Sequence, residues 1–97
     1  MVGLTVLVVD RRAQERRDLI LALQRLGAHA IGAHVPTDAV ALLDGLTADI
    51  VVVRSDDPDG ALAYLRSRTV LVHLPEHTSL EATLAALLAP LTQHLSN

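Results

Sequence analysis

Short aliphatic runs alternate along the chain with stretches of helical hydrophobic spacing. The first and third runs are uninterrupted and rich in β-branched residues, as in strands that are buried on both faces of a parallel sheet. The second run alternates less regularly and carries two histidines, which predicts an edge strand. The four runs therefore predict strands, at residues 4–9, 28–35, 50–53 and 70–74.

A helix is predicted after each strand, and local signals mark where the helices begin and end. Gly27 stands where a left-handed residue is expected to end the first helix. Thr37 is placed to cap the second helix, and Asp57 and Pro58 suit the N-cap and first turn of the third. The predicted helices cover residues 13–26 and 37–46 and begin near residues 57 and 78.

The last predicted helix is the most apolar one. Thr78 and Glu81 have the spacing of a capping box at its start, and Pro90 is expected to kink it or end it early. Leucines at helical spacing form one apolar stripe along this helix, namely Leu80, Leu84, Leu87, Leu88, Leu91 and Leu95.

The alternation of strand and helix predicts a three-layer α/β domain. Strands that are joined by helical crossovers form a parallel sheet covered on both faces, because such crossovers are right-handed. The chain has 97 residues, which predicts a single domain over residues 1–97.

Composition excludes several function classes. Tyr64 is the only aromatic residue, which argues against base stacking and hence against direct nucleic-acid binding, as does the formal charge of −3. Cysteine is absent, so disulfides, thiolate metal sites and cysteine nucleophiles are excluded. No apolar run approaches the ~20 residues of a membrane span, and the start lacks the basic region of a signal peptide. We expect a soluble, cytoplasmic domain with no membrane contact.

Two strand-to-loop segments resemble the receiver domains of bacterial response regulators. Residues 6–10 read VLVVD and precede an Arg-rich helix that ends at Leu26 and Gly27, similar to the start of receivers. Residues 49–54 read DIVVVR and resemble the strand that leads to the phosphorylated Asp of that family, with Pro58 following four residues later. The resemblance covers about residues 4–75 and implies a flavodoxin-like parallel sheet of four strands, ordered 2-1-3-4, without the family's fifth strand.

The residues that receivers use for phosphorylation are replaced here. Phosphoryl transfer in that family needs an Asp nucleophile, carboxylates for Mg²⁺, a hydroxyl and a Lys. The resemblance places Arg54 at the nucleophile, Arg11 at the second acidic position beside Asp10, and Leu74 at the hydroxyl, and the chain has no Lys. We therefore predict a degenerate pocket without catalytic residue, metal or cofactor. A buried pair between Arg54 and Asp10 could fix the surrounding loops in one conformation.

The fourth strand and the last helix raise the question of a partner. No further β-branched run follows residues 70–74, so this strand would be an apolar edge. A homodimer could cover it, by pairing edge to edge or by packing the last helix between protomers. Alternatively, that helix folds over its own sheet. The predicted interface residues are Leu84, Leu87, Leu88, Leu91 and Leu95.

Other clusters of polar residues have ordinary interpretations beside functional ones. His73 and His77 have metal-ligand spacing only on a helix, and a proline lies between them. Arg12 and Arg16 share a helix face and could dock an acidic or phosphorylated partner, or belong to a solvated face. Asp56 and Asp57 could replace the missing nucleophile, although Asp57 suits a helix cap better. Motifs of nucleophilic enzymes and Gly-rich phosphate loops are absent, so an enzyme is not expected.

Three functional hypotheses follow from these residues. The first is a phosphorylation-independent, receiver-like module for protein–protein contact in bacterial signalling or transcriptional regulation, acting as a homodimer or on a regulator or sensor protein. The second is the N-terminal sensory domain of an RNA-binding antiterminator, because degenerate receivers precede such output domains. The third is a phosphotransfer receiver that uses Asp56.

Overall fold

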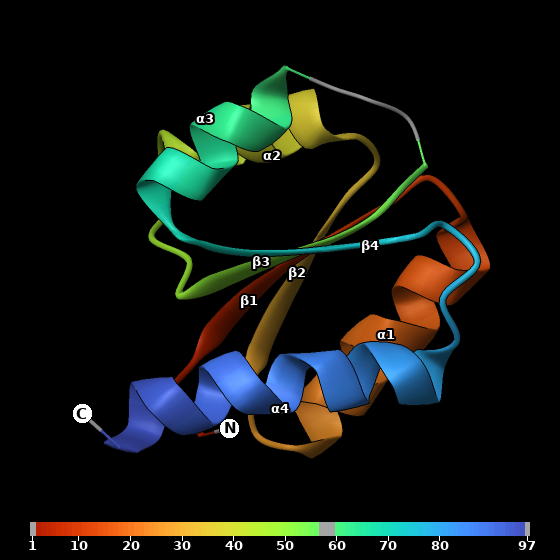
Figure 1. The fold of residues 1–97 in the computed structure, drawn as a ribbon, viewed down its shortest axis with the longest axis vertical. Helices are drawn as coiled ribbons and strands as arrows, with labels where there is room; N and C mark the ends of the chain where they lie inside the picture. Colours follow the sequence, from red (N-terminus) through yellow and green to blue (C-terminus); the bar gives the residue numbers. More distant parts are fainter. Residues whose placement is uncertain (1, 57–59, 97) are drawn as a thin grey trace.

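The computed structural model describes residues 2–56 and 60–96, without the side chains of residues 91–96 (Figure 1). Strands and helices alternate strictly along these residues, as the sequence predicts. The strands are β1 (Thr5–Asp10), β2 (His29–Ala33), β3 (Ile50–Arg54) and β4 (Val70–Leu74). The helices are α1 (Ala13–Arg25), α2 (Pro36–Leu43), α3 (Ala61–Arg68) and α4 (Leu80–Ser96).

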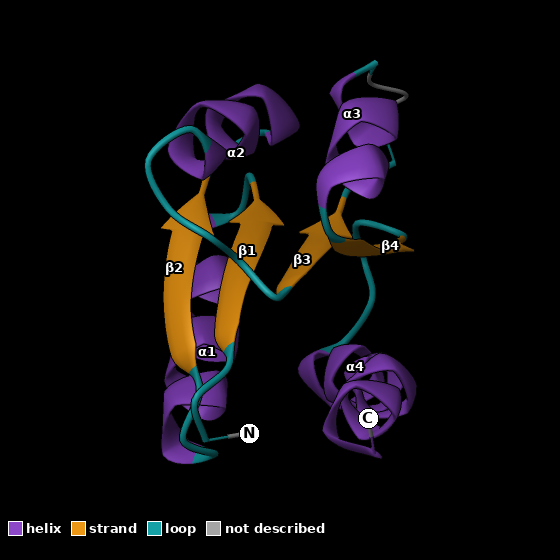
Figure 2. Ribbon diagram, turned by 90° about the vertical axis from the view of Figure 1, so that its left-hand side faces the viewer, coloured by secondary structure: helices purple, strands orange, loops and turns teal. Residues whose placement is uncertain are grey.

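The four strands form one parallel sheet in the order β2-β1-β3-β4. Helices α1 and α4 cover one face, and α2 and α3 cover the other (Figures 1 and 2). This arrangement confirms the predicted three-layer, flavodoxin-like fold and its strand order. Among the described residues, no helix has the length and apolar character to cross a membrane.

Successive side chains of the central strands enter two different cores. Val6 and Val8 pack under α1 and α4, whereas Leu7 and Val9 pack under α2 and α3. Strands β1 and β3 are buried on both faces, which explains their uninterrupted hydrophobic sequences. The largest side chains that are fully buried on the helices are Leu19, Leu23, Leu65 and Leu87.

The end of α1 matches the glycine signal. Gly27 has a φ angle of +91°, the left-handed conformation that side chains other than glycine rarely adopt. A Cβ atom here would lie 2.8 Å from Cγ2 of Val2, so the exposed Val2 side chain would also have to shift.

The starts of two helices differ from the sequence prediction. Helix α2 begins at Pro36, with Val35 as its N-cap and no capping side chain, so Thr37 lies inside the first turn. Proline is tolerated there because the first N–H groups of a helix have no partner within it. Helix α3 begins at Ala61 with Gly60 as its N-cap, while the predicted cap residues Asp57 and Pro58 lie outside the described residues.

Helix α4 also differs from its predicted limits. The hydroxyl of Ser79 accepts the N–H of Ala82 at 3.1 Å, so the cap is Ser79 and not Thr78. The Thr78 hydroxyl instead donates to the carbonyl of Pro75 at 2.7 Å. Pro90 lies inside the helix, which continues to Ser96, so the proline does not end it.

Candidate functional site

The carboxyl ends of β1 and β3 form the site to which the predicted pocket residues belong. The chain passes from β1 to β2 on one side and then crosses to β3 on the other side of β1. Ligands and catalytic groups of open α/β sheets gather at such reversals of strand order. The register places Asp10 beside Arg54 and Arg54 beside Leu74, so three strand ends meet at this edge.

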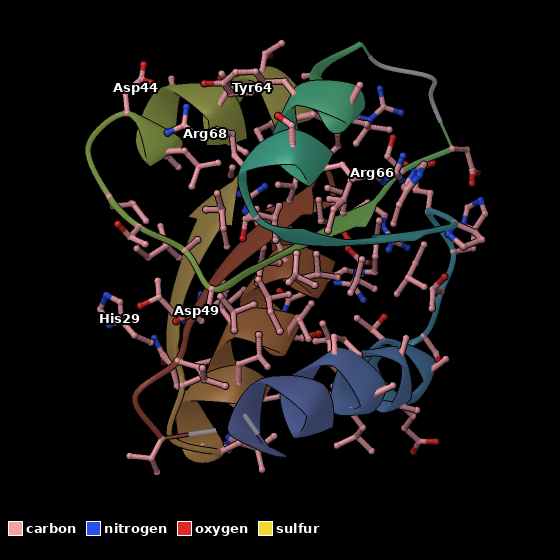
Figure 3. The ribbon with its side chains drawn as sticks, turned by 60° about the vertical axis from the view of Figure 1, so that its left-hand side comes forward. His29, Asp44, Asp49, Tyr64, Arg66 and Arg68 are labelled. Atoms are coloured by element: carbon pink, nitrogen blue, oxygen red, sulfur yellow. The ribbon has the colours of Figure 1, made fainter. Side chains whose placement is uncertain are left out.

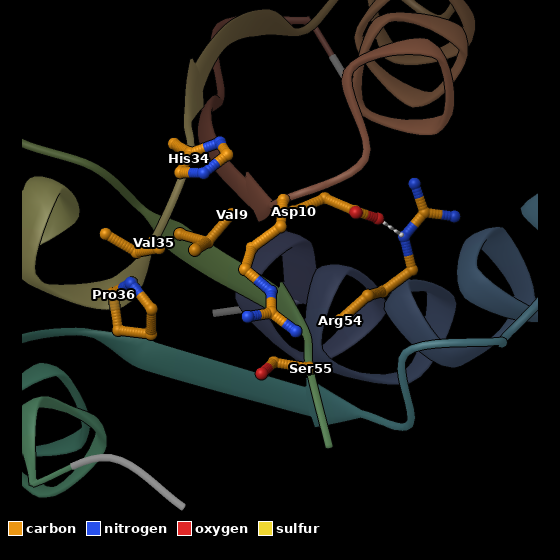
Figure 4. Close-up of a pocket in the computed structure, with 8 residues that line it drawn as sticks. Val9, Asp10, His34, Val35, Pro36, Arg54 and Ser55 are labelled. Carbon is orange, nitrogen blue, oxygen red and sulfur yellow. Dashed lines mark ion pairs between the residues drawn. The ribbon is translucent and has the colours of Figure 1, made fainter. Parts of the chain in front are cut away.

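Asp10 and Arg54 form a buried ion pair at this edge. Nε of Arg54 lies 2.8 Å from Oδ2 of Asp10, and the two side chains are 2% and 0% exposed (Figure 4). The Nε–H group is not directed at a hydrogen-bond acceptor, so this contact is held by charge. The pair that the sequence predicted is therefore present.

The guanidinium of Arg54 also contacts two helices. Nη2 donates to the carbonyl of Glu15 in α1 at 2.8 Å. Nη1 lies 3.4 Å from the carbonyl of Thr78 and 3.4 Å from the hydroxyl of Thr83, which is fully buried on α4. Burial lowers the pKa of Arg54, and the charge of Asp10 opposes that effect. One side chain thus joins the end of β3 to β1, α1 and α4.

Two further arginines surround Asp10. The main-chain N–H and Nε of Arg12 donate to Oδ1 of Asp10 at 2.8 and 3.2 Å, and Nη2 of Arg12 lies 3.1 Å from Oδ2. This hydrogen bonding raises the pKa of Arg12. Nη1 of Arg16 donates to the main-chain carbonyl of Asp10 at 2.7 Å. Both guanidiniums thus contact Asp10 while their side chains stay partly exposed, and the dock for an acidic partner stays a prediction.

The other two predicted pocket residues, Arg11 and Leu74, make contacts of their own. Nη2 of Arg11 lies 3.4 Å from Oε1 of Glu76, in an exposed ion pair between two loops. Leu74 packs against the core under α1 and α4 and offers no hydroxyl. Asp10 has guanidiniums on both sides, whereas Mg²⁺ needs several oxygen ligands. Among the described residues, the site consists of ion pairs and hydrogen bonds that join the ends of strands to helices.

A small hollow opens beside the ion pair. Its volume is about 60 Å³, far below the about 300 Å³ of the smallest typical ligand pockets. The loop between β2 and α2 forms one wall, which the sequence did not reveal because nothing in that loop has a recognisable motif. The lining residues are Val9, Asp10, Arg11, His34, Val35, Pro36, Arg54 and Ser55 (Figure 4).

A second polar group joins the loops after β3 and β4. Ligand atoms of Asp56, Glu76 and His77 lie within 4.8 Å of one another, and Oδ1 of Asp56 accepts the N–H of Glu76 at 3.0 Å. These are ligand types for divalent cations, but the Arg11 charge beside Glu76 weakens the attraction for a cation. His73 is separate from this group, since its Nε2 lies 2.9 Å from the carbonyl of Ser55.

The leucine stripe of α4 belongs mainly to the fold itself. Leu87 is fully buried against the sheet and Leu84 packs against the same core, so the helix covers its own sheet. This contradicts the place of Leu87 in the predicted interface. Leu88 is 57% exposed, while the side chains of Leu91 and Leu95 lie outside the described residues.

Comparison with known proteins does not identify a family for this chain. A scan against models of protein families finds no match, and a search of curated proteins finds no similar sequence. The receiver resemblance therefore remains a prediction from the residues.

Proposed function

We propose that this chain is a degenerate receiver-like module that acts through protein–protein contact and without phosphorylation. Its setting is signalling or transcriptional regulation in the bacterial cytoplasm, and its role is binding, not catalysis. The Arg54–Asp10 ion pair is the single observation that carries the proposal.

The ion pair supports the proposal through its position. It stands at the reversal of strand order, where a phosphate-accepting receiver would hold a carboxylate nucleophile and a metal. A guanidinium cannot attack phosphorus, and its positive charge next to Asp10 opposes the binding of Mg²⁺. Arg54 therefore replaces the nucleophile and disfavours the metal, which are the two requirements of aspartyl phosphorylation.

The contacts of Arg54 also favour one fixed arrangement of the site. Its guanidinium links β3 to Glu15 on α1 and to Thr83 on α4, so movement of either helix breaks contacts with a buried charge. Breaking such contacts is costly when the charge stays buried. A module held in this way presents the same surface to its partner at all times.

Reaction with a small phosphodonor tests the proposal. The chain is incubated with acetyl phosphate and Mg²⁺ and its intact mass is recorded, with a receiver that retains its acidic residues as positive control. We expect no phosphoryl adduct. An adduct that disappears in the Asp56→Asn variant would instead establish a phosphotransfer receiver that uses Asp56 and would overturn the proposal.

A further inference from the structure

The outer edge of β4 has no neighbouring strand among the described residues. In Figure 1, β4 crosses in front of the other strands, between α3 and α4. Val70 is 47% exposed and His73 is also exposed. An open edge presents unpaired main-chain N–H and C=O groups that can bind another strand.

The hydrogen bonds of β4 show which residues point outward. The N–H of Ser55 donates to the carbonyl of Leu74 at 3.0 Å, so the polar main-chain groups of Leu74 face β3. These groups point to alternate sides along a strand, so Leu71 and His73 direct theirs to the open edge. Two outward-facing residues are enough for a short antiparallel pairing.

We infer that a second copy of this chain pairs antiparallel with β4, with Val72 on the two-fold axis. Leu71 of each copy then lies opposite His73 of the other, which gives four main-chain hydrogen bonds. The inference names a partner for the proposed module. Its biological role rests on the proposed function, whereas the pairing geometry is argued from β4 alone.

The ends of β4 select this register over its neighbours. An axis at Leu71 would pair His73 with Thr69, whose N–H already donates to the carbonyl of Leu65 at 3.0 Å. An axis at His73 would pair Leu71 with Pro75, which has no N–H. Only the axis at Val72 uses both outward-facing residues without these losses.

Charge complementarity favours a second copy as the occupant. With the axis at Val72, the end of α3 that carries Arg68 comes near the end of β4 of the other copy, where Glu76 follows the strand, and this approach occurs twice. Arg68 now lies over the ring of Tyr64, 5.5 Å from its centroid, on the exposed side of α3 (Figure 3). To form an ion pair across the axis, Arg68 would release its hydrogen bond to the Tyr64 hydroxyl and Glu76 would exchange Arg11 for Arg68, by side-chain rotation of the kind that is common at interfaces. Between these ends, Val70 faces Leu74, so no like charges oppose each other.

Single cysteines test the register, because the chain has no native cysteine. Across the axis, the Cα atoms of two residues at position 72 lie about 4.5 Å apart, close enough for a disulfide. Val72→Cys is therefore expected to form a covalent dimer on mild oxidation. Val70→Cys is the matched control, since this valine is more exposed but its two copies lie about 14 Å apart along the strands.

Sedimentation equilibrium of the unmodified chain and a charge exchange complete the test. We expect a reversible dimer that Arg68→Glu or Glu76→Arg weakens about tenfold and that the double variant restores. A monomer at all concentrations, or equal crosslinking through residues 70 and 72, would overturn the inference. Neither result would affect phosphorylation independence, which the phosphodonor experiment tests separately.

Discussion

Arg54 and Asp10 stand opposite each other at the ends of neighbouring strands, and 2.8 Å separates Nε of Arg54 from Oδ2 of Asp10. The same guanidinium contacts the carbonyl of Glu15 and the hydroxyl of Thr83. The edge of the sheet that serves as a reactive site in related folds is thus occupied by a structural contact. We therefore expect the stability of this edge of the domain to depend on the Arg54 side chain.

The forked shape of the guanidinium is needed at residue 54. Arg54→Lys is expected to lower the free energy of unfolding by about 2 kcal/mol, because an ammonium group cannot reach Asp10, Glu15 and Thr83 together. Urea denaturation measures the change. Arg66→Lys on the exposed face of α3 is the control and should stay within about 0.5 kcal/mol of the unmodified chain. Equal effects at both positions would contradict this role.

The two adjacent leucines of α4 are expected to behave oppositely. Leu87→Ala removes a fully buried side chain from the core under α1 and α4 and should cost about 2–5 kcal/mol of stability. Leu88→Ala changes a side chain that is 57% exposed and should cost less than about 0.5 kcal/mol. Thermal and urea unfolding of both variants provide the comparison. A larger loss at Leu88 would mean that α4 packs with its other face inward.

The start of α4 distinguishes two neighbouring hydroxyl residues. Ser79→Ala removes the acceptor for the N–H of Ala82 and should cost about 1 kcal/mol, together with faster hydrogen exchange in the first turn. Thr78→Ala removes only an exposed hydrogen bond to the carbonyl of Pro75 and should cost less. The reverse order would show that Thr78 caps the helix.

The sequence predicts the fold well because its strongest signals are local. Uninterrupted aliphatic runs mark β1 and β3 as central strands, and the alternation of strand and helix determines the layers. Asp10 and Arg54 could be brought together from sequence because the receiver resemblance places both in one pocket, and the register of β1 and β3 sets them side by side. Helix starts were less predictable, since Thr78 and Ser79 carry the same capping hydroxyl and only the path of the loop decides between them.

The rest of the site depends on contacts between distant segments. Helical spacing correctly relates Arg12 to Arg16, but it does not show that both long side chains turn back to Asp10. The contact of Arg54 with Thr83 requires α4 to pack across the sheet, and Leu87 gives that packing its apolar anchor. Spacing in sequence carries no signal for such contacts.

A double-mutant cycle with Asp10→Asn and Arg54→Met tests most directly whether the ion pair holds the site together. Each single variant removes one charge and leaves its partner buried, whereas the double variant removes both. Urea denaturation of the four proteins should give a favourable coupling free energy above about 1 kcal/mol. Additive effects, within about 0.5 kcal/mol, would contradict the account, because they would show that the two charges do not stabilise each other.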